Sequence, residues 1–143
     1  MSMRCRAQVI LWTLTLMASA MASAVANANS FAGLDLERIL PIETPELKSG
    51  TAIAKKLPTR LPRPLFLLGT DRRSLAWLKV HYAKLRQLNA VGLIIDANSV
   101  PELKRIMLAA EGLLLVPASA SDIARALDLT HYPVLLIDDR AVP

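Results

Sequence analysis

Cysteine is almost absent from this chain of 143 residues, whose only example, Cys5, lies near the N-terminus. Disulfides and dithiol redox pairs need two cysteines, and thiolate metal sites use several. Cys5 also precedes the apolar stretch of residues 7–17, whereas a lipoprotein cysteine would follow it. The sequence therefore excludes disulfide staples, thiol redox chemistry and thiolate metal sites from the chain beyond that stretch.

The sequence motifs of nucleotide-binding and hydrolytic enzymes are also lacking. The five glycines are scattered singly, so there is no glycine-rich phosphate loop, and neither G-x-S-x-G nor H-E-x-x-H occurs. The two histidines, His81 and His131, fall in different predicted elements without the spacing of metal ligands. Asp138 and Asp139 follow a predicted strand and are interpreted as a turn. We therefore expect no catalytic residue, no metal site and no bound cofactor.

A strong charge of one sign is missing as well. The formal net charge is +5, and without Arg4 and Arg6 the chain carries 15 basic against 12 acidic residues, a charge of +3. Proteins that hold duplex DNA by its phosphates usually present a stronger, clustered basic face. We expect no direct binding of nucleic acid.

What is present at the N-terminus is the three-zone pattern of a signal peptide over residues 1–28. Arg4 and Arg6 form the positive zone, residues 7–17 the apolar zone, and overlapping A-x-A cleavage sites follow between positions 22 and 28. The alternative is an uncleaved anchor, but the apolar zone is too short for a bilayer core of ~30 Å. We predict cleavage near Ala24 to Ala28 and an exported protein without a transmembrane segment.

Residues 29–63 are interpreted as an irregular, extended arm. Five of the nine prolines lie between positions 41 and 64, and no helical or strand period is sustained there. The arm is basic, and its cations allow a peripheral contact with membrane headgroups or with an acidic partner. A solvated linker is the simpler interpretation, because proline-rich charged segments commonly have that role. The basic residues concerned are Lys48, Lys55, Lys56, Arg60 and Arg63.

Residues 64–143 are predicted to form an α/β domain of three layers with the order βαβαβαβ. Short apolar runs alternate there with amphipathic stretches, and Ser99 with Glu102 makes a capping box before the second helix. An all-parallel doubly wound sheet and a thioredoxin-like sheet with an antiparallel late strand both fit this order. The predicted strands are 65–68, 90–95, 113–116 and 134–137, and the predicted helices are 74–88, 100–110 and a short third helix that begins at Ser119 or Ser121 and runs through Leu127.

One local feature runs against helix electrostatics. Arg72 and Arg73 stand in the first turn of a predicted helix, where the helix dipole disfavours cations. Two solvated arginines, partly offset by Asp71, are the plain interpretation. Departures from such local preferences are typical of functional sites. A helix start at the carboxyl end of a strand is suited to an anion such as a partner's carboxylate.

Five segments carry a resemblance to a known family. They are PIETPELKSG at 41–50, PLFLLGTD at 64–71, SLAWL at 74–78, NAVGLI at 89–94 and HYPVL at 131–135. Together they resemble an exported family of unknown function encoded on integrating conjugative elements, which is distantly similar to the periplasmic TrbC and TraW proteins of F-type conjugation. The resemblance implies a periplasmic, non-enzymatic accessory or assembly component of a conjugative, type IV secretion-like apparatus, with other apparatus proteins as partners.

The same resemblance favours the thioredoxin-like option, since LTHYPVL at 129–135 looks like the proline loop before a late strand in that fold. We therefore expect Tyr132–Pro133 to be cis. The redox motif is replaced by TDRRS at 70–74, which leaves a protein-binding groove without oxidoreductase activity. The alternative is a periplasmic enzyme or chaperone with an unrecognised site near Arg72, Arg73 and His131. The candidate partner-binding residues are Asp71, Arg72, Arg73, Ser74, Thr130, His131, Tyr132 and Pro133.

Overall fold

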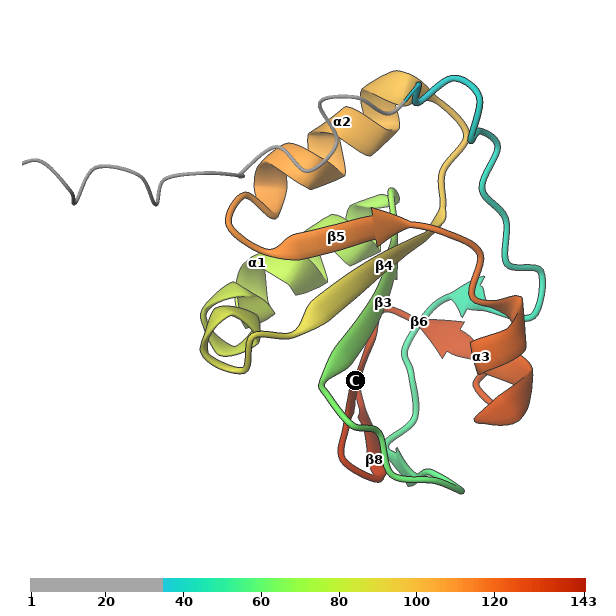
Figure 1. Ribbon diagram of the computed structural model, residues 1–143, viewed down its shortest axis with the longest axis vertical. Coiled ribbons are helices and arrows are strands. Elements are labelled where there is room, and N and C mark those ends of the chain that lie inside the picture. The colour runs from blue at the N-terminus through green and yellow to red at the C-terminus, as the bar shows by residue number, and fades with distance from the viewer. Residues whose placement is uncertain (1–34) are drawn as a thin grey trace, which may run out of the picture. The chain divides into compact units, whose positions relative to one another are not determined.

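The computed structural model describes residues 35–143 (Figure 1), so the predicted signal peptide and its cleavage sites lie outside the described residues. Helices and strands alternate along residues 65–137, which confirms the predicted α/β class. Within residues 35–143 no helix is both long enough and apolar enough to cross a membrane.

A mixed sheet of six strands is the centre of the fold, in the order β2-β8-β7-β3-β4-β5. β3, β4 and β5 are parallel, whereas β7 is antiparallel to β3 and continues through a hairpin into β8. The all-parallel doubly wound alternative is therefore wrong, and the mixed sheet is compatible with the thioredoxin-like option. The bounds are β2 (Lys55–Lys56), β8 (Arg140–Val142), β7 (Val134–Ile137), β3 (Leu65–Gly69), β4 (Val91–Asp96) and β5 (Leu114–Pro117).

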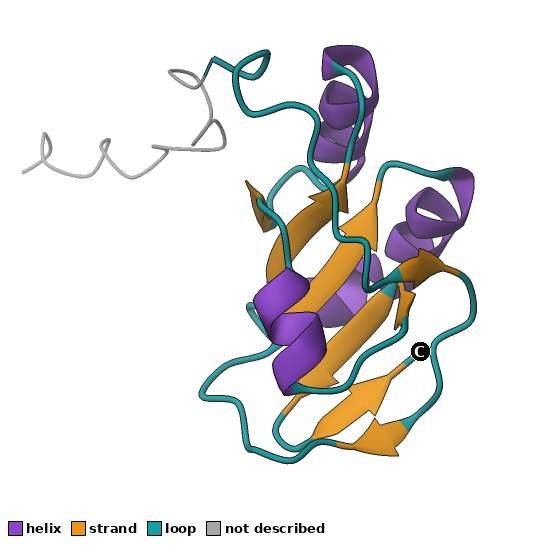
Figure 2. Cartoon of the chain, turned by 90° about the vertical axis from the view of Figure 1, so that its right-hand side faces the viewer, coloured by secondary structure: helices purple, strands orange, loops and turns teal. Residues whose placement is uncertain are grey.

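Helices cover both faces of this sheet. α1 (Arg72–Gln87) connects β3 to β4 and α2 (Val100–Ala109) connects β4 to β5, so right-handed crossovers place both on one face. α3 (Ser121–Ala126) lies on the other face, and Figure 2 shows it in front of the sheet with α1 behind. The predicted cap of α2 is confirmed, because the Ser99 side chain accepts a hydrogen bond from the Glu102 amide.

Apolar side chains fill the space between these layers. The packing around Gly92 on the α1 side is tight, because a Cβ atom there would overlap the side chains of Leu115 and Phe66. Burial of this kind supplies most of the folding free energy of a domain of this size. The largest side chains without exposure are Phe66, Leu67, Leu68, Leu78, Leu85, Ile94, Ile95, Leu103, Ile106, Val134, Leu135 and Leu136.

The described part of the arm is not a solvated linker. Ile42, Leu47, Ala52 and Leu57 are all at most 7% exposed, and the last three belong to the core cluster under α3. These side chains recur every fifth residue, a spacing that matches neither a helix nor a strand. The arm therefore packs through single apolar side chains, and their spacing gives neither a helical nor a strand pattern in the sequence.

Main-chain hydrogen bonds hold the arm as well. Ile42 and Ala97 exchange two backbone bonds of 2.9 and 3.0 Å beyond the end of β4. The short strand β1 (Lys48–Ser49) pairs in parallel with β6 (His131–Tyr132), and β2 pairs with β8. The peptide bond Tyr132–Pro133, directly after β6, is cis as predicted.

Candidate functional site

The turn after β3 and the loop before β7 lie together at the carboxyl end of β3, although about 60 residues separate them in the sequence. Gly69, the last residue of β3, lies directly beneath Tyr132: a Cβ atom on it would stand 2.8 Å from Tyr132 Cε2 and 3.0 Å from Asp71 Oδ1. The fold thus brings together the two halves of the predicted site.

Asp71 is the hub of the first half. Its Oδ2 accepts a 2.7 Å hydrogen bond from Ser49 Oγ and its Oδ1 a 2.6 Å bond from Ser74 Oγ, while the Ser74 amide caps α1 through Oδ2. Ser74 Oγ in turn accepts a 2.9 Å bond from the Gly69 amide. Partial burial alone would raise the pKa of Asp71, but the bonds from Ser74 and Ser49 outweigh it and lower that pKa. Asp71 is therefore an ionised anchor whose lone pairs are occupied.

Tyr132 is the hub of the second half. Its ring is 5% exposed, and its hydroxyl donates a 3.4 Å hydrogen bond to Asp96 Oδ2 at the end of β4. Burial raises the pKa of Asp96, the bond from Tyr132 opposes that rise, and the charge of Asp71 adds to it. Burial, together with the Asp96 charge, also raises the pKa of Tyr132, which keeps the phenol neutral. Sequence reasoning missed Asp96, although its place after a neighbouring parallel strand was a usable signal.

Residues 47–52, here called the strap, cross this site from one half to the other. The Lys48 amide donates to the Thr130 carbonyl and the Gly50 amide to the Tyr132 carbonyl, both at 3.0 Å. The strap therefore occupies the backbone edge of the loop, where the resemblance implies a protein-binding groove. The surface of the site is therefore made of side chains of the strap as well as those of the loop.

The predicted site residues divide into buried and exposed groups. Ser74, Tyr132 and Pro133 are buried and Asp71 is half-buried, so these four are not freely solvated loop residues. Arg72, Arg73 and Thr130 are exposed and His131 is half-buried. The first group supports the site, and only the second is available to a partner.

The exposed residues of the site lie along its edge. Arg73 Nη1 donates a 3.3 Å bond to Thr51 Oγ1 of the strap, and Thr130 Oγ1 lies 2.9 Å from His131 Nδ1. Lys48 is the register partner of His131 in the parallel β1–β6 pair, so these side chains leave it on the same side. The side chain of Arg72 makes no hydrogen bond or ion pair with any residue in 35–143. We call this group the contact rim: Lys48, Arg72, Arg73, Thr130 and His131.

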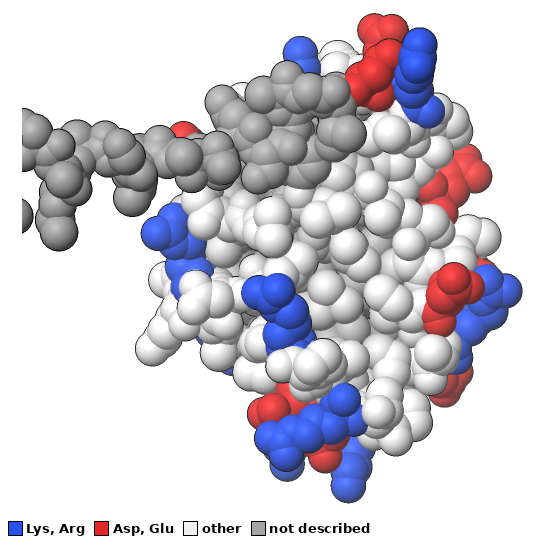
Figure 3. Space-filling view, in the orientation of Figure 1, with Lys and Arg blue, Asp and Glu red and all other residues white. Residues whose placement is uncertain are grey.

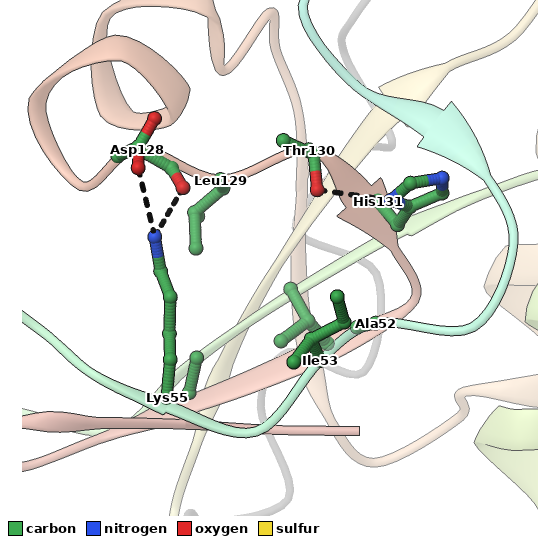
Figure 4. Close-up of a pocket in the computed structure, with 9 residues that line it drawn as sticks. Ala52, Ile53, Lys55, Asp128, Leu129, Thr130 and His131 are labelled. Atoms are coloured by element: carbon green, nitrogen blue, oxygen red, sulfur yellow. Dashed lines mark hydrogen bonds and ion pairs between the residues drawn. The ribbon is translucent and has the colours of Figure 1, made fainter.

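A hollow of about 220 Å³ opens beside the rim, between the strap and the end of α3 (Figure 4). Lys55 Nζ reaches across one end to the Asp128 carbonyl and lies 3.6 Å from Asp128 Oδ2. Ala52, Leu129 and Val134 line the floor. The hollow is smaller than typical small-molecule sites of ~300 Å³ or more, and its size suits one side chain of a partner.

Hydrogen bonds within the fold already engage the hydroxyl groups of the site. The hydroxyls of Ser49 and Ser74 are both bound to Asp71, and neither has a histidine partner that would activate it as a nucleophile. Within residues 35–143 no three side chains of His, Cys, Asp or Glu converge on a point.

Comparison with known proteins gives one match. The model of a protein family of unknown function, DUF2859, matches residues 15–141. No curated protein and no solved structure matches the chain.

Proposed function

The chain belongs to the DUF2859 family, and we propose that it is a periplasmic accessory or assembly component of a conjugative, type IV secretion-like DNA transfer apparatus. In this proposal the protein is exported through its N-terminal signal, cleaved near Ala24 to Ala28, and acts by contacts with other proteins of the apparatus. Catalysis has no part in it. The five sequence segments that resemble the exported proteins of integrating conjugative elements, including SLAWL and HYPVL, support this role.

The observation that carries the proposal is the contrast between the interior of the site, whose polar side chains bind one another, and the rim, whose cations have no carboxylate partner within residues 35–143. Asp71, Ser49 and Ser74 bind one another, as do Asp96 and Tyr132, so these groups hold the turn and the loop in place. Arg72 and Lys48, by contrast, are exposed and form no ion pair within residues 35–143. Rigid support beneath free side chains is the arrangement of a binding surface.

The charge of the rim indicates the chemistry of the partner. Lys48, Arg72 and Arg73 are cations, and the rim contains no acidic residue. Guanidinium groups bind carboxylates in a bidentate geometry, and arginine is enriched among the residues that dominate protein interfaces. We therefore propose an acidic protein surface as the partner, with one of its side chains in the hollow beside His131.

An in-frame deletion of the gene, scored for the frequency of conjugation, tests the role. The deletion strain is complemented with the wild type, with Arg72→Ala/Arg73→Ala, or with the control Arg63→Ala/Arg140→Ala. Both double variants remove two exposed arginines, but only the first touches the rim. We expect the deletion and the rim variant to reduce transfer and the control to restore it. Normal transfer in the deletion strain rejects the role, and normal transfer with the rim variant rejects the site.

A further inference from the structure

The outer faces of α1 and α2 carry most of the unbalanced positive charge of the described chain. α1 contains five basic residues and no acidic one, and α2 contains two basic residues against Glu102 alone. Both helices lie on the same face of the sheet, and all seven cations are exposed. They are Arg72, Arg73, Lys79, Lys84, Arg86, Lys104 and Arg105.

Cations elsewhere in the fold are mostly compensated. Lys55 pairs with Asp128, Lys56 with Asp139 at 3.9 Å, Arg60 with Asp138 at 3.0 Å and Arg38 with Asp35 at 2.9 Å, so four of the six basic residues of the arm are engaged. Figure 3 shows such groups of both signs side by side along the lower and right-hand margins of the face over α3. None of the seven helical cations has a carboxylate partner within residues 35–143. Since surface charges of both signs are usually interspersed, an uncompensated helical face indicates an anionic partner.

Apolar side chains stand among these cations. Val80 on α1 is 79% exposed and Leu108 on α2 is 74% exposed. Ala76 and Ala83 lie four residues before and three residues after Val80, so they share its stripe of the α1 surface. The outer face of the two helices thus combines cations, which anionic lipid attracts, with single protruding aliphatic side chains that can enter the headgroup layer.

We propose that the outer face of α1 and α2 docks the protein on an anionic membrane surface. Lipid headgroups rearrange around single protruding side chains such as Val80 and Leu108, whereas a folded acidic protein would need a matching pit for each. Each Lys or Arg at an anionic leaflet strengthens binding about fivefold, so several together give a useful affinity. This inference goes beyond the proposed function and moves the expected membrane contact from the arm to the helices.

Sedimentation with lipid vesicles tests the proposal. The protein, purified with the N-terminus that it has in the cell, is mixed with phosphatidylcholine vesicles or with vesicles in which about one third of the lipid is phosphatidylglycerol. We expect binding only to the anionic vesicles, and Lys79→Gln/Lys84→Gln should weaken it about thirtyfold. The control, Lys56→Gln/Arg60→Gln, changes the net charge equally but removes cations that are already paired, so it should bind like the wild type.

A second variant tests the apolar part of the face. Val80→Ser/Leu108→Ser keeps every charge and should also weaken binding to the anionic vesicles, because both side chains are exposed and leave the core intact. Three results overturn the proposal: equal binding to both vesicle types, equal losses in the helix variant and its control, or binding to duplex DNA or polyglutamate without binding to anionic vesicles. Arg72 and Arg73 belong to both surfaces, but all the variants used with the vesicles keep them, so this assay does not test the contact rim.

Discussion

Ser49 and Asp71 are joined by a 2.7 Å hydrogen bond from Ser49 Oγ to Asp71 Oδ2, which ties the strap to the first turn of α1 across 22 residues of sequence. The same carboxylate caps the helix through the Ser74 amide. The position of the strap and the start of α1 are therefore coupled through one side chain. Arg72 and Arg73, the next two residues, owe their positions to it.

Ser49→Ala should loosen the strap without unfolding the domain. The bond is exposed, so we expect a loss of about 1 kcal/mol in the free energy of unfolding. Hydrogen exchange of the Lys48 and Gly50 amides, which bond to the loop of Thr130 and Tyr132, should become faster. Thr59→Ala, at an exposed hydroxyl of the arm, is the matched control and should change neither quantity. Unchanged exchange in Ser49→Ala would show that the strap does not depend on this bond.

Asp71→Ala should destabilise the protein at neutral pH by about 1 kcal/mol, the usual cost of losing a helix cap. The pKa of Asp71 is lowered in the fold, so the stability that its ionised form contributes is present at neutral pH. That stability is lost as the pH falls through the acidic range below the ordinary carboxyl pKa. Urea unfolding at neutral and acidic pH measures the difference between wild type and variant, which should shrink in acid.

The control for this prediction is Asp122→Ala, at an exposed carboxylate in the first turn of α3. Surface changes of this kind usually stay within about ±0.5 kcal/mol. A stability difference between Asp71→Ala and wild type that stays constant over the whole pH range would show that the lowered pKa of Asp71 is not the source of the effect.

Asp96→Asn should show the opposite pH dependence. Burial raises the pKa of Asp96, so its ionised form is less favourable in the folded protein than in the unfolded chain. The amide keeps an oxygen that can accept the bond from Tyr132 but carries no charge. The stability of the variant relative to wild type should therefore rise as the pH increases from the acidic range to neutrality. A relative stability that falls over this range contradicts the assignment.

Gly69→Ala should disturb both halves of the site at once. The new methyl group would stand 2.8 Å from the Tyr132 ring and 3.0 Å from Asp71 Oδ1, closer than carbon contacts allow. Overpacking of this kind costs about 1–3 kcal/mol. In a double-mutant cycle, Tyr132→Leu should relieve part of the cost of Gly69→Ala, since it removes the ring that the methyl group meets. Strictly additive free energies would place the clash elsewhere.

The helices and the central strands could be predicted because their signals are local. The serine cap and the apolar period of α2 lie within a few residues of each other, and α1 begins only two residues before the predicted start at Ser74. β1 and β6 could not be predicted, because a strand of two residues exists only through its partner 83 residues away, as Lys48 and His131 illustrate. β2 depends in the same way on its distant partner β8, whereas β8 was missed although its hairpin partner β7 directly precedes it.

The position of the candidate site could be predicted from the sequence, but its hydrogen-bond partners could not. The arginines that break the dipole rule pointed to the turn at Asp71, and the fold places that turn beside the loop of Tyr132. Ser49, which donates to Asp71, and Asp96, which accepts from Tyr132, belong to no sequence motif. Their role depends on contacts between segments that lie far apart in the sequence.

Site-specific photo-crosslinking in mating cells tests the central claim, that the contact rim binds a protein of the transfer apparatus, most directly. A photo-crosslinking amino acid is placed at Arg72 on the rim or, as the control, at Arg140 of β8, and the adducts are identified by mass spectrometry. We predict a covalent adduct with an apparatus protein from position 72 and none from position 140. The absence of an adduct at position 72, or the same adducts from both positions, would contradict the account.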